Sequence, residues 1–183
     1  MECSINTQLA HKKFAYAFLS TPDVETKAVL GDTLGRWGRM PPLSRAVVVE
    51  AGRVLRDAGL LKNGRNLVIA GENVGLIGGS RKGSLSTDLN FAATFSQNPK
   101  LASPVLFSYT LPNIPLAEAA GHYGLVGPVY AIFDSDNPLD GARQEAKRLL
   151  QMQKNLSLML ACEFDHFDHD GQMKLCVTFT TVY

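Results

Sequence analysis

The clearest periodic pattern of apolar and polar residues lies between Leu43 and Gly59. Apolar positions recur every three or four residues, as on one side of a helix. They are Val47, Ala51, Val54, Leu55 and Ala58. Ser44 is a typical N-cap, Leu43 and Val48 have the spacing of a hydrophobic staple, and Gly59 favours the left-handed conformation that ends helices. The pattern therefore predicts a helix from Leu43 to Gly59.

A second amphipathic helix is predicted from Leu139 to Met152. Its apolar stripe consists of Leu139, Ala142, Ala146, Leu149 and Leu150. The side of the helix expected to face solvent carries Arg143, Lys147 and Arg148. A shorter helix is predicted from Leu116 to Tyr123, because Pro115 suits the first position of a helix.

Short apolar runs bounded by turn residues predict the strands. Leu67–Ala70 and Val129–Phe133 are such runs, and the first suits a strand that is covered on both faces. Leu156–Phe164 and Gln172–Val182 indicate a hairpin joined through Asp170-Gly171, a pair typical of a type I′ turn. We therefore expect a single α/β domain over residues 1–183, with helices on the faces of a mixed sheet.

Composition narrows the classes of protein and partner. The chain has 183 residues, 45% of them hydrophobic, and can bury one substantial core. A net charge of +1 gives no general reason to expect nucleic acid as a partner. No apolar run approaches the roughly 20 residues of a membrane-spanning helix, and the first residues lack the order of a secretory signal. Cys3, Cys162 and Cys176 are too few for a disulfide framework or a closed zinc site, so we expect a cytoplasmic protein without metal or other cofactor.

Two segments carry residue types that could hold a ligand. A glycine-rich stretch from Gly75 to Ser84 could cradle phosphate on backbone N–H groups. It ends in Lys-Gly-Ser, however, where a nucleotide-binding loop requires Gly-Lys-Ser or Gly-Lys-Thr. The segment from Asp165 to Asp170 places His166 and His169 near three carboxylates, a possible set of metal ligands. The alternative is a solvated polar loop at the hairpin tip, which we favour.

An ordered series of short motifs runs from about Arg39 to Ala161. Its members are Arg39 to Arg45 before a helix that ends in Asp57-Ala58-Gly59-Leu60, then Ser103-Pro104, Pro112-Asn113, and Gly124-Leu125-Val126-Gly127-Pro128 before a strand. This order resembles that of β-ketoacyl synthases, in which the last motif opens a buried strand that leads into the nucleophilic cysteine. The resemblance implies a thiolase-like fold, and the length implies the N-terminal half alone.

Asp136 occupies the position of the family's cysteine. In the resembling enzymes this cysteine lies at a helix N-terminus, where the helix dipole favours the thiolate. A carboxylate cannot hold an acyl group as a thioester, and the family's catalytic histidines belong to the second half. The resemblance therefore implies a protein of fatty-acid- or polyketide-type biosynthesis that does not condense acyl groups.

Asp134, Asp136 and Asp140 allow two interpretations. The carboxylates could serve as a substitute base or as metal ligands, or they could cap a helix. In the second case, which we favour, Asn137 is the N-cap, Pro138 takes the first helical position and Asp140 reaches back. Two other functions stay open: a subunit of an active 3-oxoacyl-acyl-carrier-protein synthase complex, and an acyl-group binding module.

The resemblance also implies partners. Acyl carrier proteins are acidic, and related synthases meet them with basic residues. The candidates here are Arg36, Arg39, Arg45, Arg81 and Lys82. A half-domain would leave the stripe of the helix Leu139–Met152 uncovered, so we expect a homodimer through this stripe or a strand edge, or a heterodimer with a full-length synthase. Alternatively, Phe14 and Phe18 fold back over that helix.

Overall fold

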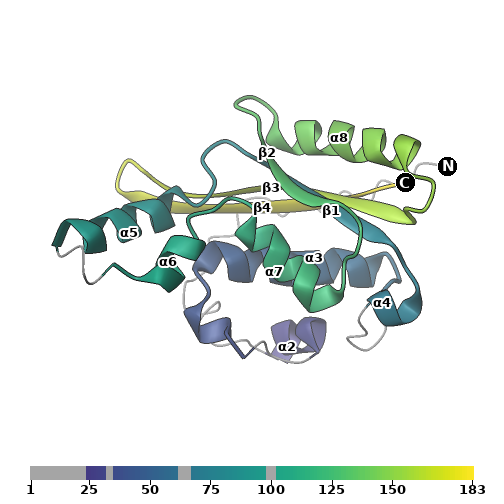
Figure 1. The fold of residues 1–183 in the computed structure, drawn as a ribbon, viewed down its shortest axis with the longest axis horizontal. Helices are drawn as coiled ribbons and strands as arrows, with labels where there is room; N and C mark the ends of the chain where they lie inside the picture. Colours follow the sequence, from purple (N-terminus) through teal and green to yellow (C-terminus); the bar gives the residue numbers. More distant parts are fainter. Residues whose placement is uncertain (1–23, 32–34, 62–66, 98–101) are drawn as a thin grey trace.

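The structure is a computed structural model that describes residues 24–31, 35–61, 67–97 and 102–183. A four-stranded sheet in the order β2-β1-β3-β4 forms its centre (Figure 1). The strands are β1 (Val74–Ser80), β2 (Val129–Phe133), β3 (Leu158–His169) and β4 (Gln172–Val182). β1 runs parallel to β2 and β3, whereas β4 returns antiparallel to β3. β2 is thus a half-exposed edge strand and not the buried strand that the resemblance implied.

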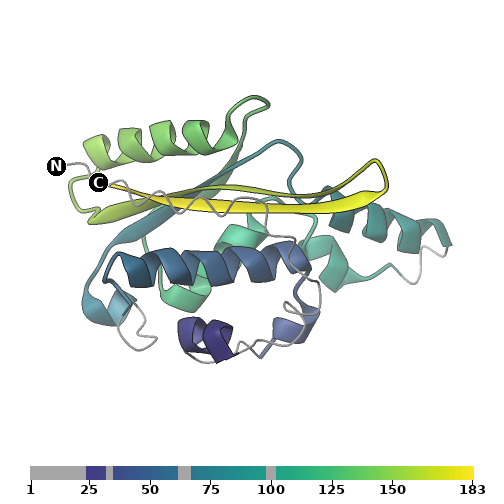
Figure 2. The ribbon, with the colours of Figure 1, turned by 180° about the vertical axis from the view of Figure 1, so that it is seen from behind.

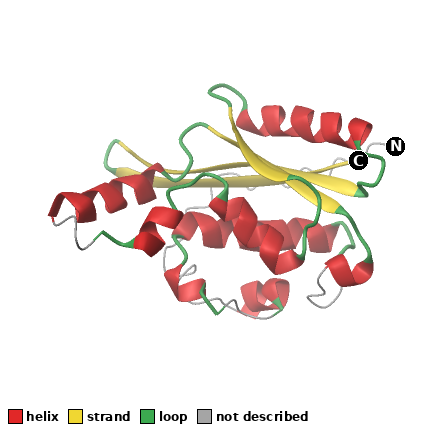
Figure 3. Cartoon of the chain, viewed as in Figure 1, coloured by secondary structure: helices red, strands yellow, loops and turns green. Residues whose placement is uncertain are grey.

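Helices cover both faces of the sheet (Figure 1 and Figure 2). α3 (Pro42–Asp57), α7 (Ile114–Tyr123) and α2 (Val24–Leu30) lie on one side, and α8 (Pro138–Met152) lies on the other. α5 (Leu85–Gln97) and α6 (Pro104–Ser108) lie near the hairpin end of β3 and β4, and η1 (Trp37–Arg39) and α4 (Leu67–Ala70) are short. Figure 3 shows the mixed sheet with helices on its faces that the sequence predicted. Within the described ranges, no helix is long and apolar enough to cross a membrane.

The sheet separates two apolar cores. The larger core lies between the sheet and the α3–α7 side, and its fully buried members include Val47, Leu55, Leu76, Leu116 and Phe164. The smaller core lies under α8, where Ala142 and Ala146 pack with Ile77, Met159 and Ala161. Because the two alanines are small, α8 can lie close to the sheet.

The chain's own sheet therefore covers the apolar stripe of α8. Ala142 and Ala146 have no exposed surface. The outward side of the helix carries the exposed residues Arg143, Lys147 and Arg148. Our expectation that this stripe stays uncovered and joins two copies is wrong, because β1 and β3 already bury it. The alternative cover by Phe14 and Phe18 lies outside the described residues.

The central strand β1 is not where the sequence pattern placed it. Leu67–Ala70, predicted as a strand, forms the single helical turn α4. The strand is Val74–Ser80, all seven residues of which are buried, although we assigned this segment to a glycine-rich loop. Its glycines permit close packing: a Cβ at Gly79 would lie 1.8 Å from the carbonyl oxygen of Pro138, and one at Gly78 would lie 2.5 Å from the Phe164 ring.

Only the C-terminal end of α3 agrees with the prediction. The helix begins at Pro42 with Pro41 as N-cap, so Ser44 lies inside the helix and is buried. The predicted cap at Ser44 and its staple are wrong, because a proline in the first turn starts the helix earlier. At the other end, Gly59 has a φ of 75°, and the predicted left-handed ending is confirmed. α7 is also confirmed, beginning at Ile114 instead of Leu116.

The β3–β4 hairpin confirms the predicted turn. Asp170 and Gly171 both have positive φ, 56° and 73°, as a type I′ turn requires. β4 has the predicted bounds, Gln172–Val182, whereas β3 extends beyond the predicted Phe164 to His169, which pairs with Gln172 beside the turn. The segment from Asp165 to His169 is therefore strand, and our assignment of it to a solvated loop is wrong.

Replacing Gly79 by alanine should destabilise the protein by about 2 kcal/mol or more, because the new Cβ would push the start of α8 away from β1. Gly121 on α7 is the matched control, because nothing lies within 4 Å of its potential Cβ. Alanine there should stabilise the helix by about 0.5–1 kcal/mol. Urea unfolding would measure both changes, and an unaltered midpoint for Gly79→Ala would contradict this packing.

Candidate functional site

The turn between β2 and α8 carries Asp136. β2 ends at Phe133, and α8 begins at Pro138, whose close approach to Gly79 fixes the start of the helix against β1. The Asp136 side chain is exposed, and its Oδ1 accepts a 3.2 Å hydrogen bond from Ser135 Oγ. The turn lies beyond the carboxyl ends of parallel strands, where α/β sheets commonly bind ligands.

Asp134 binds the backbone of the turn immediately before α8. Its Oδ1 accepts 2.9 Å hydrogen bonds from the backbone N–H groups of Asp136 and Asn137. These bonds, that of Asn137 first, lower the pKa of the Asp134 carboxyl below its usual value. Asn137 takes the predicted N-cap position without a side-chain capping bond. Asp140 pairs with Arg143 instead of reaching back, so neither Asn137 nor Asp140 makes the predicted side-chain cap.

Arg81 holds the same turn from the loop that follows β1. Its Nε donates to the carbonyl oxygen of Ser135 at 3.1 Å, and its Nη2 donates to that of Asp136 at 2.8 Å. Its Nη1 also forms an ion pair with Glu163 on β3. The guanidinium therefore joins the β1–α5 loop, β3 and the β2–α8 turn, although the side chain is 40% exposed.

The Asp165 side chain binds the loop that follows β1. Asp165 is 1% exposed. Its Oδ1 accepts hydrogen bonds from Ser80 Oγ at 2.7 Å, Lys82 N at 2.7 Å and Gly83 N at 2.8 Å. The N–H of Arg81 also donates to it, at 3.2 Å. A carboxylate of the chain itself thus occupies the N–H groups that could otherwise cradle a phosphate.

The structure separates the two histidines of the predicted metal set. His166 is 3% exposed in β3, whereas His169 is exposed and pairs with Asp170 at 2.8 Å. Because side chains alternate along a strand, these histidines point to opposite faces of the sheet. Among the described residues, no group of three or more histidine, cysteine or acidic side chains could hold a metal ion.

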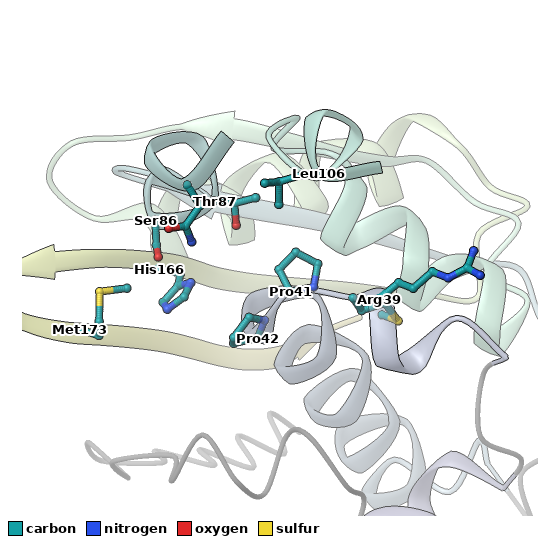
Figure 4. Close-up of a pocket in the computed structure, with 10 residues that line it drawn as sticks. Arg39, Pro41, Pro42, Ser86, Thr87, Leu106, His166 and Met173 are labelled. Carbon is teal, nitrogen blue, oxygen red and sulfur yellow. The ribbon is translucent and has the colours of Figure 1, made fainter. Parts of the chain in front are cut away.

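A cavity of about 500 Å³ lies beside His166 (Figure 4). Ser86 and Thr87 of α5 line it opposite His166, and Pro41 and Pro42 supply an apolar wall. Burial lowers the pKa of His166, so the imidazole is neutral at pH 7 and can donate one hydrogen bond and accept another. No sequence signal joined these residues, because they meet only when α5 packs across β3.

The structure does not gather the five basic candidates on one surface. Arg45 is 9% exposed, and its Nε donates to the carbonyl oxygen of Trp37 at 2.9 Å. Its assignment to a docking rim is therefore wrong, because η1 holds the guanidinium. Arg36 is more exposed but binds Glu118, with 2.7 Å between Nε and Oε2.

Arg39 and Lys82 are the exposed candidates that remain once Arg81 is assigned to the turn. Arg39 lies at the rim of the cavity with its guanidinium directed away from it (Figure 4). Lys82 Nζ lies 4.8 Å from the centre of the Phe167 ring. Strand alternation places Phe167 on the α8 side of β3, so the two cations lie on different sides of the sheet.

Comparison with known proteins shows the fold. No family model and no curated protein sequence matches the chain. Among solved structures, the ishigamide ketosynthase/chain length factor aligns with a TM-score of 0.63 and 17% identity, over 87% of this chain and 48% of that one. A β-ketoacyl synthase from Burkholderia phymatum STM815 aligns with a TM-score of 0.55 and 18% identity, over 83% of this chain and 34% of that one.

The chain therefore has a ketosynthase-like, thiolase-like fold, and the half-domain predicted from the sequence is confirmed. It spans about half the length of the first of these structures and about a third of the second.

Replacing Asp165 by alanine should lower stability by about 2–4 kcal/mol, because Ser80 and three backbone N–H groups lose their buried partner. The exposed Asp57, replaced in the same way, is the control and should change stability by less than about 0.5 kcal/mol. Sulfate should stabilise Asp165→Ala more than wild type in thermal unfolding, because the anion can occupy the vacated N–H groups. Equal stability of the two variants would contradict the role of Asp165.

Proposed function

We propose that the chain is a β-ketoacyl synthase-like protein of fatty-acid- or polyketide-type biosynthesis that does not itself condense acyl groups. One observation carries this proposal: Asp134 occupies the backbone N–H groups of Asp136 and Asn137, immediately before α8. A thiolate nucleophile at this position would depend on the same N–H groups and on the helix dipole.

The charge of the turn supports the same conclusion. Asp134 and Asp136 lie two residues apart, and Asp136 stands where the resemblance places the cysteine. A further anion, such as the oxyanion of an acyl-transfer intermediate, would meet two carboxylates and no free N–H of Asp136 or Asn137. The turn therefore suits a structural role better than the activation of a nucleophile.

The proposed role is that of a structural or carrier-docking partner, with residues 1–183 acting as a single domain. A homodimer is our first choice of assembly, and a heterodimer with a full-length synthase is our second. The name of one structural neighbour, a ketosynthase/chain length factor, supports an assembly of this kind. We place the protein in the cytoplasm, which agrees with the free thiols of Cys162 and Cys176.

An acyl-group binding module is the second candidate function. The cavity beside His166 favours it, because it combines apolar walls with a few convergent polar groups. Native mass spectrometry of the purified protein separates the two functions: a bound acyl compound supports the binding module. Co-purification with a subunit that carries a cysteine and two histidines would instead support a subunit of an active complex.

The isolated chain should form no carbon–carbon bond from acyl-carrier and malonyl-carrier substrates, because Asp136 provides no thiol. Asp136→Cys should remain inactive, and its new thiol should keep a pKa of about 8.5, since the Asp134 carboxylate still binds the N–H groups of residues 136 and 137 beside it. The pH dependence of alkylation by iodoacetamide would measure this pKa.

The double variant Asp134→Asn, Asp136→Cys is the matched comparison. Removing the neighbouring charge should lower the thiol pKa by about one unit relative to Asp136→Cys. Condensation by the wild-type chain would refute the proposed function. An equal thiol pKa in the two variants would refute the part assigned to Asp134.

Carrier docking should depend on the exposed cations. Because Arg39 and Lys82 lie on different sides of the sheet, one of the two variants Arg39→Glu and Lys82→Glu, whichever alters the docking side, should slow association with an acidic acyl carrier protein by about tenfold at low salt. Lys147→Glu, on the outward side of α8, is the control for a change in net charge. Surface plasmon resonance against several carrier proteins would measure the rates. Failure to bind any of them, or equal rates for all three variants, would exclude docking at these residues.

A further inference from the structure

The cavity beside His166 lies on the face of the sheet that is turned away from the Asp136 turn. Side chains alternate along β3, so His166 points to the same side as Phe164, which belongs to the core between the sheet and α3. Glu163, the ion-pair partner of Arg81, points to the other side, where α8 lies. The cavity is therefore separate from the turn on which the proposed function rests.

Two hydroxyl groups of α5 are available to a ligand in this cavity. Ser86 and Thr87 are 7% and 3% exposed, and Figure 4 shows their oxygen atoms on the side of α5 that faces β3. Within the described ranges, neither hydroxyl has a hydrogen-bond partner. A ligand that bonds these groups would supply hydrogen bonds that folding leaves unmade.

The charges around the cavity favour an uncharged ligand. Among the described residues that line it, Arg39 is the one charged residue, and its guanidinium points away (Figure 4). Asp88 is the one charged residue of α5, and it lies about 200° around the helix axis from Ser86 and from Asn90. A charged ligand would lose its water in the cavity and meet no opposite charge there.

The apolar walls of the cavity suit an aromatic ring. Pro41 and Pro42 present rigid proline rings, and Met40 and Met173 add thioether groups. Proline rings pack against aromatic rings in the recognition of proline-rich segments, and thioether sulfur atoms make favourable contacts with the edges of aromatic rings. A ring that lies against these walls can direct a polar substituent toward the hydroxyl groups of α5.

We propose that this cavity binds an uncharged aromatic compound whose amide or hydroxyl substituent forms hydrogen bonds with Ser86 and Thr87. A cavity of about 500 Å³ has the size of a small-molecule site. The proposal goes beyond the proposed function and holds whether or not the chain condenses acyl groups, because different residues carry it. It also differs from the acyl-group binding module, whose ligand is a chain and not a ring.

Benzamide tests the site, and benzoate is the charged compound of nearly the same shape. Titration of the full chain, followed by heteronuclear NMR, should shift the backbone amide signals of α5 and of β3 near His166. The dissociation constant of benzamide should be about 1 mM, as is usual for a ligand of this size. Benzoate should bind at least about tenfold more weakly, because its carboxylate meets no cation.

Two substitutions on α5 test the hydroxyl groups. Thr87→Val keeps the shape of the side chain and should weaken benzamide binding about three- to tenfold, and Ser86→Ala should do the same. Thr94→Val is the matched control and should leave binding unchanged. Thr94 lies on the same helix outside the cavity, and its hydroxyl donates to the carbonyl oxygen of Phe91 at 2.7 Å. Far-ultraviolet circular dichroism would show that all three variants are folded.

Hexanamide, an uncharged chain of similar size, separates this proposal from the acyl-group binding module. It should bind at least about threefold more weakly than benzamide, because a flexible chain loses more conformational freedom than a ring. Equal or tighter binding of hexanamide would overturn the aromatic class and favour the acyl-group binding module. Equal binding of benzoate would overturn the uncharged class. Benzamide shifts that are absent or lie away from α5 and β3, or an equal loss of affinity in Thr94→Val, would overturn the site itself.

Discussion

The buried carboxylate of Asp165 is the constraint on which the functional end of the fold depends. It reaches from β3 into the loop after β1 and binds Ser80 Oγ and the N–H groups of Lys82 and Gly83. A buried charge is tolerated only when hydrogen bonds replace its water, and the tight loop supplies them. The conformation of this loop in turn directs the side chain of Arg81 toward the β2–α8 turn.

Arg81 connects this loop to the β2–α8 turn. Its guanidinium binds the carbonyl oxygens of Ser135 and Asp136, while Asp134 takes the N–H groups on the other side of the turn. The backbone of the turn is thus satisfied from both sides by the chain's own charged groups. Such a turn is well held but offers few free donors to a substrate, which is the physical basis for proposing a scaffold in place of a condensing enzyme.

The sheet itself decides which surfaces remain for a partner. It buries the alanine stripe of α8, so the charged outer side of that helix faces outward. The stripe is therefore not available to a second copy of the chain. The two edges differ, since Asn113 closes part of β2, whereas β4 is long and carries one charge.

Local chemistry in the sequence determined several elements. Helical periodicity predicted α3 and α8, and Asp170-Gly171 predicted the hairpin, because these signals act over a few residues. Tertiary structure decided the rest. The glycines of β1 suggested a loop, but in the structure Pro138 and Phe164 pack against them. Asp165 and His166 suggested a solvated tip, but β3 buries both, and Arg45 suggested a surface cation, although η1 holds it. Burial depends on contacts between residues far apart in the chain, so only the folded structure could assign these side chains.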